Sequence, residues 1–343
     1  MIAIAKPFLG EEEKQAVGSV IDSGMIACGA VVEEFERRFA AYTGAAHGIA
    51  TTSGTTALEV ALRALGIGPG DKVLTTPFSF IASTNSIVYT GATPVFADID
   101  PRTFNISVDQ IEKKLAEQPD IKALLIVHLF GQACDMDPLL DVVKKHGLLL
   151  VEDCAQAHGA MYKGRRVGTF GDAAAFSFYP TKNMTTGEGG MMLTPHQEVA
   201  EKARLLINHG MKVRYHHDIV GYNYRMSNVI AGVVRGQIPY LEEHIAQKKA
   251  IYMRYKEGLK GLPVQMNPYD EKDSEPNFWL SCMIIDKDAM CKQVRGEQDA
   301  LYISEPGKSC PMEILETLAR YNAEGRPIWK PMHMQPIFRM NGF

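Results

Sequence analysis

The chain alternates short, almost wholly apolar runs with segments of helical periodicity from about residue 43 to residue 194. Such runs are typical of strands buried on both faces, and their alternation with helices indicates a mostly parallel sheet covered on both sides. We therefore predict an α/β fold whose ligands bind beyond the carboxyl ends of the strands. The strand candidates are DKVLTT, TPVFADID, KALLIVHLFG, GLLLVEDCAQ and DAAAFSFYP.

The segments between these strands carry the apolar stripe of an amphipathic helix. In TTALEVALRALG the apolar side chains repeat at i, i+3, i+4, i+7 and i+8, and SVDQIEKKLAEQ and DMDPLLDVVKKHG are similar. The GIGPGD run resembles a dinucleotide-binding fingerprint, but it follows a helix and precedes a strand, which is the reverse of the required order. We interpret it as a helix end and a turn.

The character of the chain changes near residue 239. A long charged helix is predicted over YLEEHIAQKKAIYMRYKEGLKG, followed by a strand candidate, WLSCMIID, and a helix candidate, CPMEILETLARYNAEG. We predict a large domain over residues 1–238 and a smaller α+β domain over residues 239–343. Residues 1 to about 25 are expected to pack on the smaller domain.

Composition excludes several classes of partner. The net charge is −4, so no general attraction to nucleic acid or to an anionic membrane is expected. No apolar run approaches the roughly 20 residues that span a bilayer, and MIAIAKPFLGEEEKQ has no signal-peptide pattern. The six cysteines lack CxxC spacing, and the histidines, His216 and His217 included, lack metal-ligand spacing. We expect a cytoplasmic protein with reduced thiols and no metal site.

A run of small and hydroxyl-bearing residues begins the first helix of the alternation. Ser53, Gly54, Thr55 and Thr56 precede the apolar stripe, and the free amides of a helix N-terminus can bind an anion such as phosphate. The alternative is an ordinary helix N-cap, for which serine is equally suited. In TTPFSFIAS, Phe78 and Phe80 follow a strand, either as core aromatics or as rings that stack on a flat cofactor.

Acidic residues end the most apolar strand candidate, LLLVEDCAQ. Neighbouring side chains on a strand point to opposite faces, so Glu152 and Asp153 are not a catalytic carboxylate pair. One carboxylate directed into a site is enough to partner a protonated ring nitrogen. A charge at the end of so buried a strand needs a cationic partner, and Gln156 is placed to donate a hydrogen bond nearby.

Lys182 follows the apolar strand candidate DAAAFSFYP. A lysine there costs desolvation energy unless it is compensated, so it is either the point where the strand reaches water or a functional amine. Phosphate-binding amides, a stacking ring, a carboxylate and a lysine, each near a strand end, form the set that pyridoxal 5'-phosphate (PLP) requires. The sequence therefore predicts a PLP-dependent enzyme.

The chain resembles the DegT–StrS family of nucleotide-sugar aminotransferases, which have the type I PLP-dependent transferase fold. The similarity runs from about Pro7 to the C-terminus. It rests on SGTTAL, FSFIASTN, GATPVFADID, VEDCAQAHGA, FGDAAAFSFYPTKNMTTGEGG, GYNYRMSN and RPIWKPMHMQPIF. Family members usually continue by some tens of residues beyond IFRMNGF, so we expect the small domain to be truncated.

The resemblance implies a role for each site residue. Lys182 is the Schiff-base lysine, Asp153 partners the pyridinium nitrogen, Gln156 lies near the ring hydroxyl and Phe80 stacks on the ring. Asn223 reaches the site of the neighbouring subunit, which predicts a homodimer with shared active sites. The phosphate is assigned to Ser53, Gly54, Thr55 and Ser177. The sugar nucleotide is assigned to Gly24, Met25, Ile26, Ala27, Trp329, Lys330, Met332 and His333.

The family also implies the reaction, in which an amino acid, glutamate by analogy, donates its amino group to a keto sugar on a nucleotide. The motifs look most like those of enzymes that aminate C4 of a UDP-4-keto-6-deoxy-N-acetylhexosamine. A dTDP- or GDP-linked 4-keto or 3-keto sugar is an alternative. Two other functions are a PLP-dependent sugar dehydratase, which has histidine in place of the lysine, and a catalytically silent PLP-binding regulatory protein.

Overall fold

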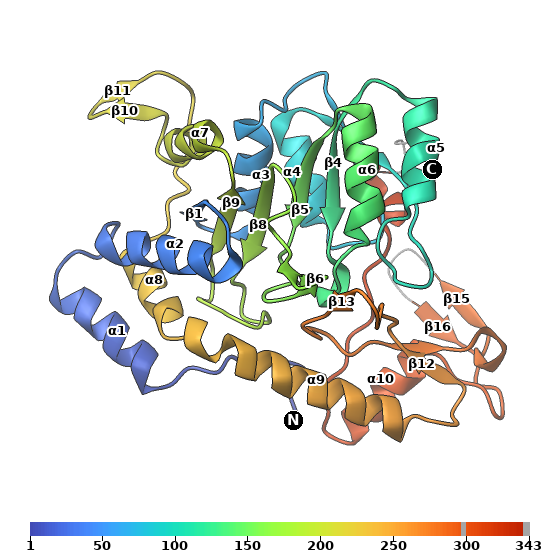
Figure 1. The fold of residues 1–343 in the computed structure, drawn as a ribbon. Helices are drawn as coiled ribbons and strands as arrows, with labels where there is room; N and C mark the ends of the chain where they lie inside the picture. The colour runs from blue at the N-terminus through green and yellow to red at the C-terminus, as the bar shows by residue number, and fades with distance from the viewer. Residues whose placement is uncertain (296–299, 339–343) are drawn as a thin grey trace.

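The computed structural model describes residues 1–295 and 300–338. Its centre is a seven-stranded sheet in which β9 runs antiparallel to both neighbours and the pairs from β8 to β3 are parallel (Figure 1). In spatial order the strands are β1 (His47–Thr51), β9 (Gly190–Thr194), β8 (Ala173–Ser177), β5 (Leu149–Asp153), β4 (Ile121–Val127), β2 (Lys72–Thr75) and β3 (Thr93–Phe96). The predicted α/β fold with a mostly parallel sheet is confirmed.

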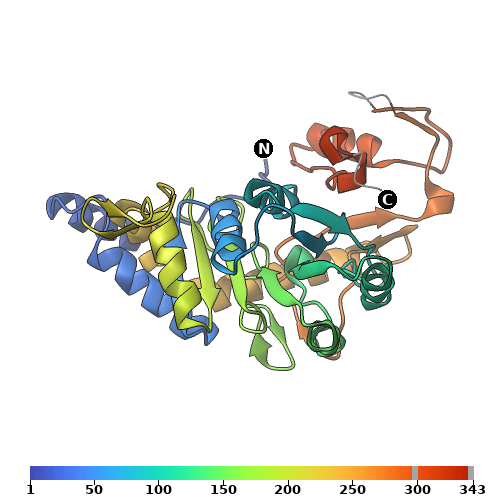
Figure 2. The ribbon, with the colours of Figure 1, turned by 90° about the horizontal axis from the view of Figure 1, so that it is seen from above.

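Helices cover both faces of this sheet, and each face has its own apolar core (Figure 2). The helices on one face are α2 (Ala30–Thr43), α5 (Val108–Glu117), α6 (Met136–His146) and α8 (Asn228–Arg235). Those on the other face are α3 (Gly54–Ala64), α4 (Ala82–Thr90) and α7 (Gln197–Ile207). Alternate side chains of β4 enter the two cores, since Leu124 and Ile126 lie in one and Leu125 and Val127 in the other.

The helix ends follow local chemistry. Ser53 and Ser107 are N-caps whose hydroxyl oxygens accept backbone N–H groups at the start of α3 and α5. Helix α6 ends at Gly147, whose φ of 65° is readily adopted only without a side chain. The helices predicted over these segments are confirmed, and GIGPGD forms the predicted turn between α3 and β2.

The C-terminal part begins with the η2 turn and continues with a long helix along one side of the molecule (Figure 1). Its main elements are η2 (Ile238–Tyr240), α9 (Leu241–Gly258), β12 (Val264–Met266), β14 (Met283–Ile285), η3 (Lys287–Ala289), β15 (Gln293–Arg295), β16 (Ala300–Tyr302), α10 (Pro311–Arg320), η4 (Met332–Met334) and η5 (Pro336–Phe338). The predicted helices correspond to α9 and α10. The predicted truncation concerns the end of this part, and residues 339–343 lie outside the described residues.

The N-terminal residues contact two parts of the fold. Helix α1 (Glu11–Asp22) packs against α8, whereas the backbone of Ile2 hydrogen-bonds to residues 322 and 324 beyond α10. The remaining short strands are β6 (Met161–Tyr162), β7 (Arg165–Arg166), β10 (Met211–Val213), β11 (His216–His217) and β13 (Ser274–Glu275), with the turn η1 (Leu129–Gly131). Within residues 1–295 and 300–338, no helix is both long enough and apolar enough to cross a membrane.

Candidate active site

Lys182 lies in the turn that follows β8, where its backbone N–H donates to the carbonyl of Tyr179. Its Nζ lies 3.8 Å from the centre of the Trp279 ring, a distance at which an ammonium group is attracted to the ring face. Burial lowers the pKa of Lys182 from 10.5 to about 8, and the negative charge of Asp153 opposes part of this shift. The amine is therefore close to the balance between its charged and its nucleophilic form near neutral pH.

Asp153 ends the neighbouring strand β5, which pairs in parallel with β8. The two carboxyl ends thus lie at one edge of the sheet, as expected for parallel strands. The carboxylate is buried, and it accepts hydrogen bonds from the Ser83 hydroxyl (2.6 Å) and from the Ala155 amide (3.0 Å). Burial raises the pKa of Asp153, and these hydrogen bonds and the charge of Lys182 act against that shift.

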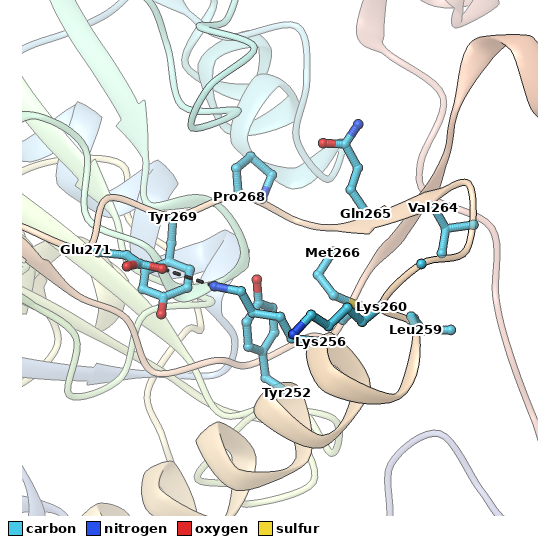
Figure 3. A pocket seen from close by; sticks show the side chains of 11 residues that line it. Tyr252, Lys256, Leu259, Lys260, Val264, Gln265, Met266, Pro268, Tyr269 and Glu271 are labelled. Atoms are coloured by element: carbon cyan, nitrogen blue, oxygen red, sulfur yellow. Dashed lines mark hydrogen bonds and ion pairs between the residues drawn. The ribbon is translucent and has the colours of Figure 1, made fainter.

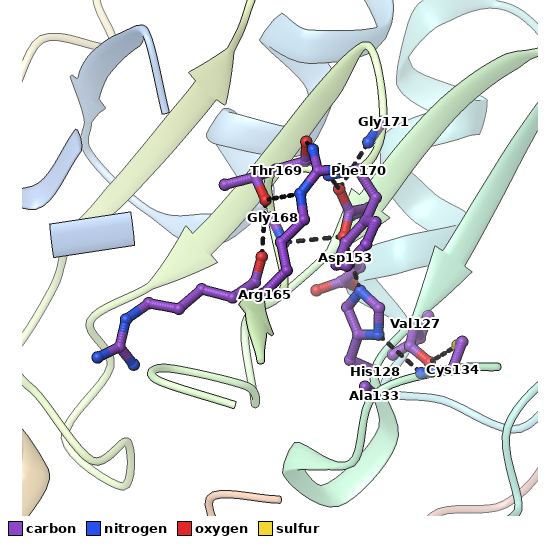
Figure 4. Close-up of polar contacts among 12 residues, drawn as sticks. Val127, His128, Ala133, Cys134, Asp153, Arg165, Gly168, Thr169, Phe170 and Gly171 are labelled. Atoms are coloured by element: carbon purple, nitrogen blue, oxygen red, sulfur yellow. Dashed lines mark hydrogen bonds and ion pairs between the residues drawn. The ribbon is translucent and has the colours of Figure 1, made fainter. Parts of the chain in front are cut away.

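Glu152 points to the other side of the strand, as the alternation of the strand predicts. It accepts hydrogen bonds from His128 Nε2 (3.0 Å) and from the amides of Gly168, Phe170 and Gly171 (Figure 4). Burial acts to raise the pKa of Glu152, but these hydrogen bonds outweigh it and lower the pKa overall. Glu152 therefore stabilises the loop between β5 and β8.

Glu152, His128 and Cys154 place one potential metal-ligating atom each within 4.8 Å of one another. Both ring nitrogens of His128 are already engaged, because Nδ1 accepts the amide of Cys134 while Nε2 donates to Glu152 (Figure 4). Both carboxylate oxygens of Glu152 accept backbone amides as well. The imidazole and the carboxylate are thus satisfied by each other and by backbone amides.

The predicted phosphate-binding residues lie together. Ser53 caps α3, and its Oγ accepts the amide of Thr56 at 3.2 Å, so the residue is an N-cap in this structure. Gly54 directly faces Ser177 at the end of β8, and a Cβ built on Gly54 would lie 2.6 Å from the Ser177 Cβ. Thr55 is half-buried in the first turn of α3. Small and hydroxyl-bearing groups therefore surround the free amides of this helix N-terminus. We call this group, formed by Ser53, Gly54, Thr55 and Ser177, the cradle.

Phe80 and Gln156 are the two residues predicted to contact the cofactor ring from outside the strand ends. The Phe80 ring is 53% exposed and meets the Trp329 ring edge-on at 6.0 Å. Gln156 is buried, and its Oε1 accepts the amide of Phe130 at 2.8 Å. Phe80 thus presents an accessible ring, while the Gln156 carbonyl oxygen is bound to the chain itself.

The segment from Trp329 to His333 docks on this region. Trp329 stacks on Phe130 at 5.7 Å and on Trp279 at 6.2 Å. The amide of buried Met332 donates to the Pro77 carbonyl at 2.7 Å, whereas Lys330 and His333 are exposed. The C-terminal part therefore adds an aromatic wall beside Phe80 and Lys182.

Two predicted elements stand apart from this group. The loop containing Gly24, Met25, Ile26 and Ala27 is exposed and is held by Asn228, which donates to the Met25 carbonyl at 2.7 Å. Its flanking helices lie at the opposite side of the molecule from the Trp329 segment (Figure 2). Asn223 is also exposed, although its neighbour Tyr224 accepts the amide of Thr52 beside the cradle. Among the residues that the structure describes, neither this loop nor Asn223 contacts Lys182 of the same chain.

Two site residues were not singled out from the sequence. Ser83 contacts Asp153, and Asn277 places Trp279 by accepting its amide while donating to the carbonyls of Gln156 and His158. Trp279 begins the strand candidate WLSCMIID, a pattern that carries no signal of a site residue. Ser83 lies in FSFIASTN, one of the runs that carry the family resemblance, but nothing in its spacing distinguishes it from Ser79.

A separate cavity of about 310 Å³ lies between the end of α9 and the chain around β12 (Figure 3). Tyr252, Lys256, Tyr269 and Glu271 contribute to its wall, and Lys256 pairs with Glu271 at 3.1 Å. None of the residues of the Lys182 region lines this cavity. The candidate site is the strand-end cluster and not this cavity.

The model of the DegT/DnrJ/EryC1/StrS aminotransferase family matches residues 7–342. The chain belongs to this family. GDP-perosamine synthase from Caulobacter vibrioides is 39% identical to this aminotransferase over 341 residues, covering 98% of this chain and 86% of the relative. UDP-N-acetyl-3-dehydro-alpha-D-glucosamine 3-aminotransferase from Acidithiobacillus ferrooxidans is 41% identical over 259 residues, covering 75% and 70%.

The crystal structure of S. venezuelae DesV in complex with a ketimine intermediate superposes with a TM-score of 0.84. It is 35% identical, and the match covers 98% of this chain and 86% of DesV. These findings confirm the predicted family, the type I fold, the aminotransferase class and PLP as the cofactor.

The residues present fit PLP. Gly54 and Ser177 lie so close together that a side chain at position 54 would occupy the space beside the first amides of α3. Without that side chain, a phosphate can approach these amides. The amine of Lys182 suits the cofactor aldehyde, and the buried carboxylate of Asp153 suits the ring nitrogen. The donor set of this aminotransferase thus matches the phosphate, the aldehyde and the pyridinium group of one molecule.

Proposed function

We propose that this aminotransferase moves the amino group of glutamate to C4 of a UDP-4-keto-6-deoxy-N-acetylhexosamine. The observation that carries the proposal is the shared strand edge, which places the Lys182 amine, the Asp153 carboxylate and the Gly54–Ser177 cradle together. PLP bound there supplies an electrophilic aldehyde and an electron-accepting ring.

The chain's own residues have separate tasks in this proposal. Lys182 Nζ, with its pKa of about 8, accepts and returns a proton at the reacting carbon, a role that typically contributes about 10²–10⁴-fold to the rate. Asp153 holds the ring nitrogen protonated, since an ionised carboxylate favours a nearby cation. Ser53, Gly54, Thr55 and Ser177 bind the phosphate and so fix the ring's position.

The sugar is the least constrained part of the proposal. The relatives' names include both a GDP sugar and a UDP sugar, so these names do not determine the nucleotide that this chain binds. The nucleotide depends on the contacts that this chain makes with it. Trp329, beside Phe80 and Trp279, offers an aromatic surface for the base or the sugar. We assign Trp329, Lys330, Met332 and His333, with the loop of Gly24, Met25, Ile26 and Ala27, to the sugar nucleotide.

We further propose a cytoplasmic homodimer with shared sites. The β10–β11 hairpin projects from the body (Figure 1), and nearby Tyr215 and Val220 are 81% and 88% exposed. Exposed apolar side chains on a projecting segment are typical of an interface. Asn223 follows this hairpin and is exposed beside the cradle, which supports a contact with the partner's cofactor.

The activity test is Lys182→Ala with Lys202→Ala as a matched control on the exposed side of α7. We expect Lys182→Ala to abolish turnover while leaving the fold intact. Full activity in Lys182→Ala would overturn the proposal. Keto sugars linked to UDP, GDP and dTDP, tested with glutamate, identify the acceptor, and preference for a GDP or dTDP sugar would overturn the UDP assignment.

The shared-site test uses two variants that are each inactive. Lys182→Ala and Asn223→Asp chains are unfolded together and refolded, so that about half of the dimers are mixed. If Asn223 serves the partner's site, one site of each mixed dimer is intact, and about one quarter of wild-type activity returns. No recovery above the separate variants would show that Asn223 serves its own chain's site or none.

A further inference from the structure

The buried carboxylate of Asp153 receives a hydrogen bond from a residue outside its own loop. Ser83 Oγ lies 2.6 Å from Asp153 Oδ2, and the two side chains are 1% and 3% exposed, respectively. The other oxygen, Oδ1, accepts the Ala155 amide at 3.0 Å. Ser83 is thus the side chain that orients Oδ2.

The direction of this hydrogen bond follows from proton counting. An ionised carboxylate can only accept, so Ser83 must use its single hydroxyl proton for Asp153. The Ser79 hydroxyl lies 3.1 Å from Ser83 Oγ and must then donate to it. The chain therefore runs from Ser79 through Ser83 to the carboxylate, and the 3.4 Å contact between Ser83 Oγ and the Phe80 carbonyl receives no proton.

The same short segment presents the stacking ring. Phe80 precedes α4, and Ser83 lies in the first turn of that helix, so one rigid element places both the ring and the hydroxyl. Lys182 lies close enough for its charge to favour the ionised carboxylate, against the burial that disfavours it. A hydrogen bond to the charged form adds to that effect and also fixes its orientation.

We propose that Ser83 is a positioning residue that holds Asp153 ionised and directed at the ring nitrogen of the cofactor, with Ser79 orienting the Ser83 hydroxyl. The inference rests on the proposed role of Asp153 and extends it to a residue that does not touch the cofactor.

The first test measures PLP affinity by titrating the cofactor-free chain. Hydrogen bonds to charged groups typically change an equilibrium by about tenfold or more, so Ser83→Ala should weaken binding by about that factor. Ser83→Thr keeps the hydroxyl and should restore affinity. Ser86→Ala is the control, because buried Ser86 lies on the same helix and donates to the Ser83 carbonyl without contacting Asp153.

A double-mutant cycle separates positioning from a general structural effect. In the Asp153→Asn background, Ser83→Ala should change PLP affinity no further, because the group that Ser83 serves is gone. The same loss in both backgrounds would overturn the inference.

A second measurement does not depend on the cofactor. Carbon NMR of the cofactor-free chain follows the Asp153 carboxyl, whose pKa should rise in Ser83→Ala and stay unchanged in Ser86→Ala. An unchanged pKa in Ser83→Ala would overturn the inference even if PLP binds. If the wild-type chain bound no PLP, the proposed function would fail while this titration still decided the role of Ser83.

Discussion

Replacing Lys182 by methionine should make the cofactor-free chain more stable at neutral pH. Burial lowers the pKa of this amine from 10.5 to about 8, which corresponds to about 3 kcal/mol of unfavourable free energy for the charged form. Methionine keeps the length and apolar character of the side chain without its charge. The cost of holding an ammonium group in the site is thereby removed.

The net gain is smaller than this cost. The variant loses the attraction between Nζ and the Trp279 ring, about 2 kcal/mol for a desolvated ammonium group, whereas the attraction to Asp153 is already included in the net pKa shift. The hydrogen bonds from Ser83 and Ala155 still satisfy the carboxylate. We therefore expect Lys182→Met to raise the free energy of unfolding by about 1–2 kcal/mol at pH 7.

The sign of the pH dependence is fixed by linkage. Between about pH 8 and pH 10.5 the unfolded chain binds a proton at Lys182 that the folded chain has released, so wild-type stability rises with pH. Lys182→Met lacks this rise of about 2 kcal/mol, so its advantage over the wild type should disappear by pH 9.5.

Urea unfolding of both cofactor-free chains at fixed protein concentration, from pH 7 to pH 9.5, measures these quantities. Lys202→Met, on the exposed side of α7, should keep the wild-type slope. Parallel curves for the wild type and Lys182→Met would mean that the amine is not desolvated in the folded chain, contrary to the lowered pKa of Lys182.

Three further changes test the surroundings of the site. Gly54→Ala places a Cβ 2.6 Å from that of Ser177, so PLP affinity should fall by about tenfold or more in an absorbance titration. Glu152→Gln should lower the free energy of unfolding at pH 7 by about 3 kcal/mol, measured in urea. The loss should shrink as pH falls below 4.5, because the lowered pKa of Glu152 stabilises the folded chain only above that range. Asn277→Ala should cost about 3 kcal/mol in the same assay, because it leaves the Trp279 amide and two buried carbonyls without partners.

Controls accompany these changes. Gly68→Ala adds its Cβ where nothing lies within 4 Å, so PLP affinity should be unchanged. An equal loss in both glycine variants would contradict the crowding argument. Stability of Glu152→Gln that follows the wild type at every pH would contradict the role given to Glu152, and an unaltered unfolding midpoint in Asn277→Ala would contradict the link between Asn277 and Trp279.

The parallel sheet and the proximity of Asp153 to Lys182 could be predicted from the sequence for one physical reason. Parallel strands bring their carboxyl ends to one edge, so residues just beyond β5 and β8 lie close together whatever the details of packing. The direction of β9 was not predicted, since its GMMLT run has the same apolar character as the parallel strands.

The side-chain contacts that position the site residues could not be predicted from the sequence pattern. Ser83 and Asp153 are 70 positions apart, and their contact depends on how α4 sits over the end of β5. Asn277 comes from the C-terminal part and meets the β5 loop 121 positions away. Such side-chain contacts follow from tertiary packing and leave no periodicity to read.

The most direct test of the proposed function is an absorbance spectrum of the PLP-loaded chain before and after addition of glutamate. We expect the band of the lysine-bound cofactor to give way to the band of its aminated form in the wild-type chain and not in Lys182→Ala. A spectrum that glutamate leaves unchanged would contradict glutamate as donor. A spectrum that no amino acid alters would contradict the aminotransferase reaction itself.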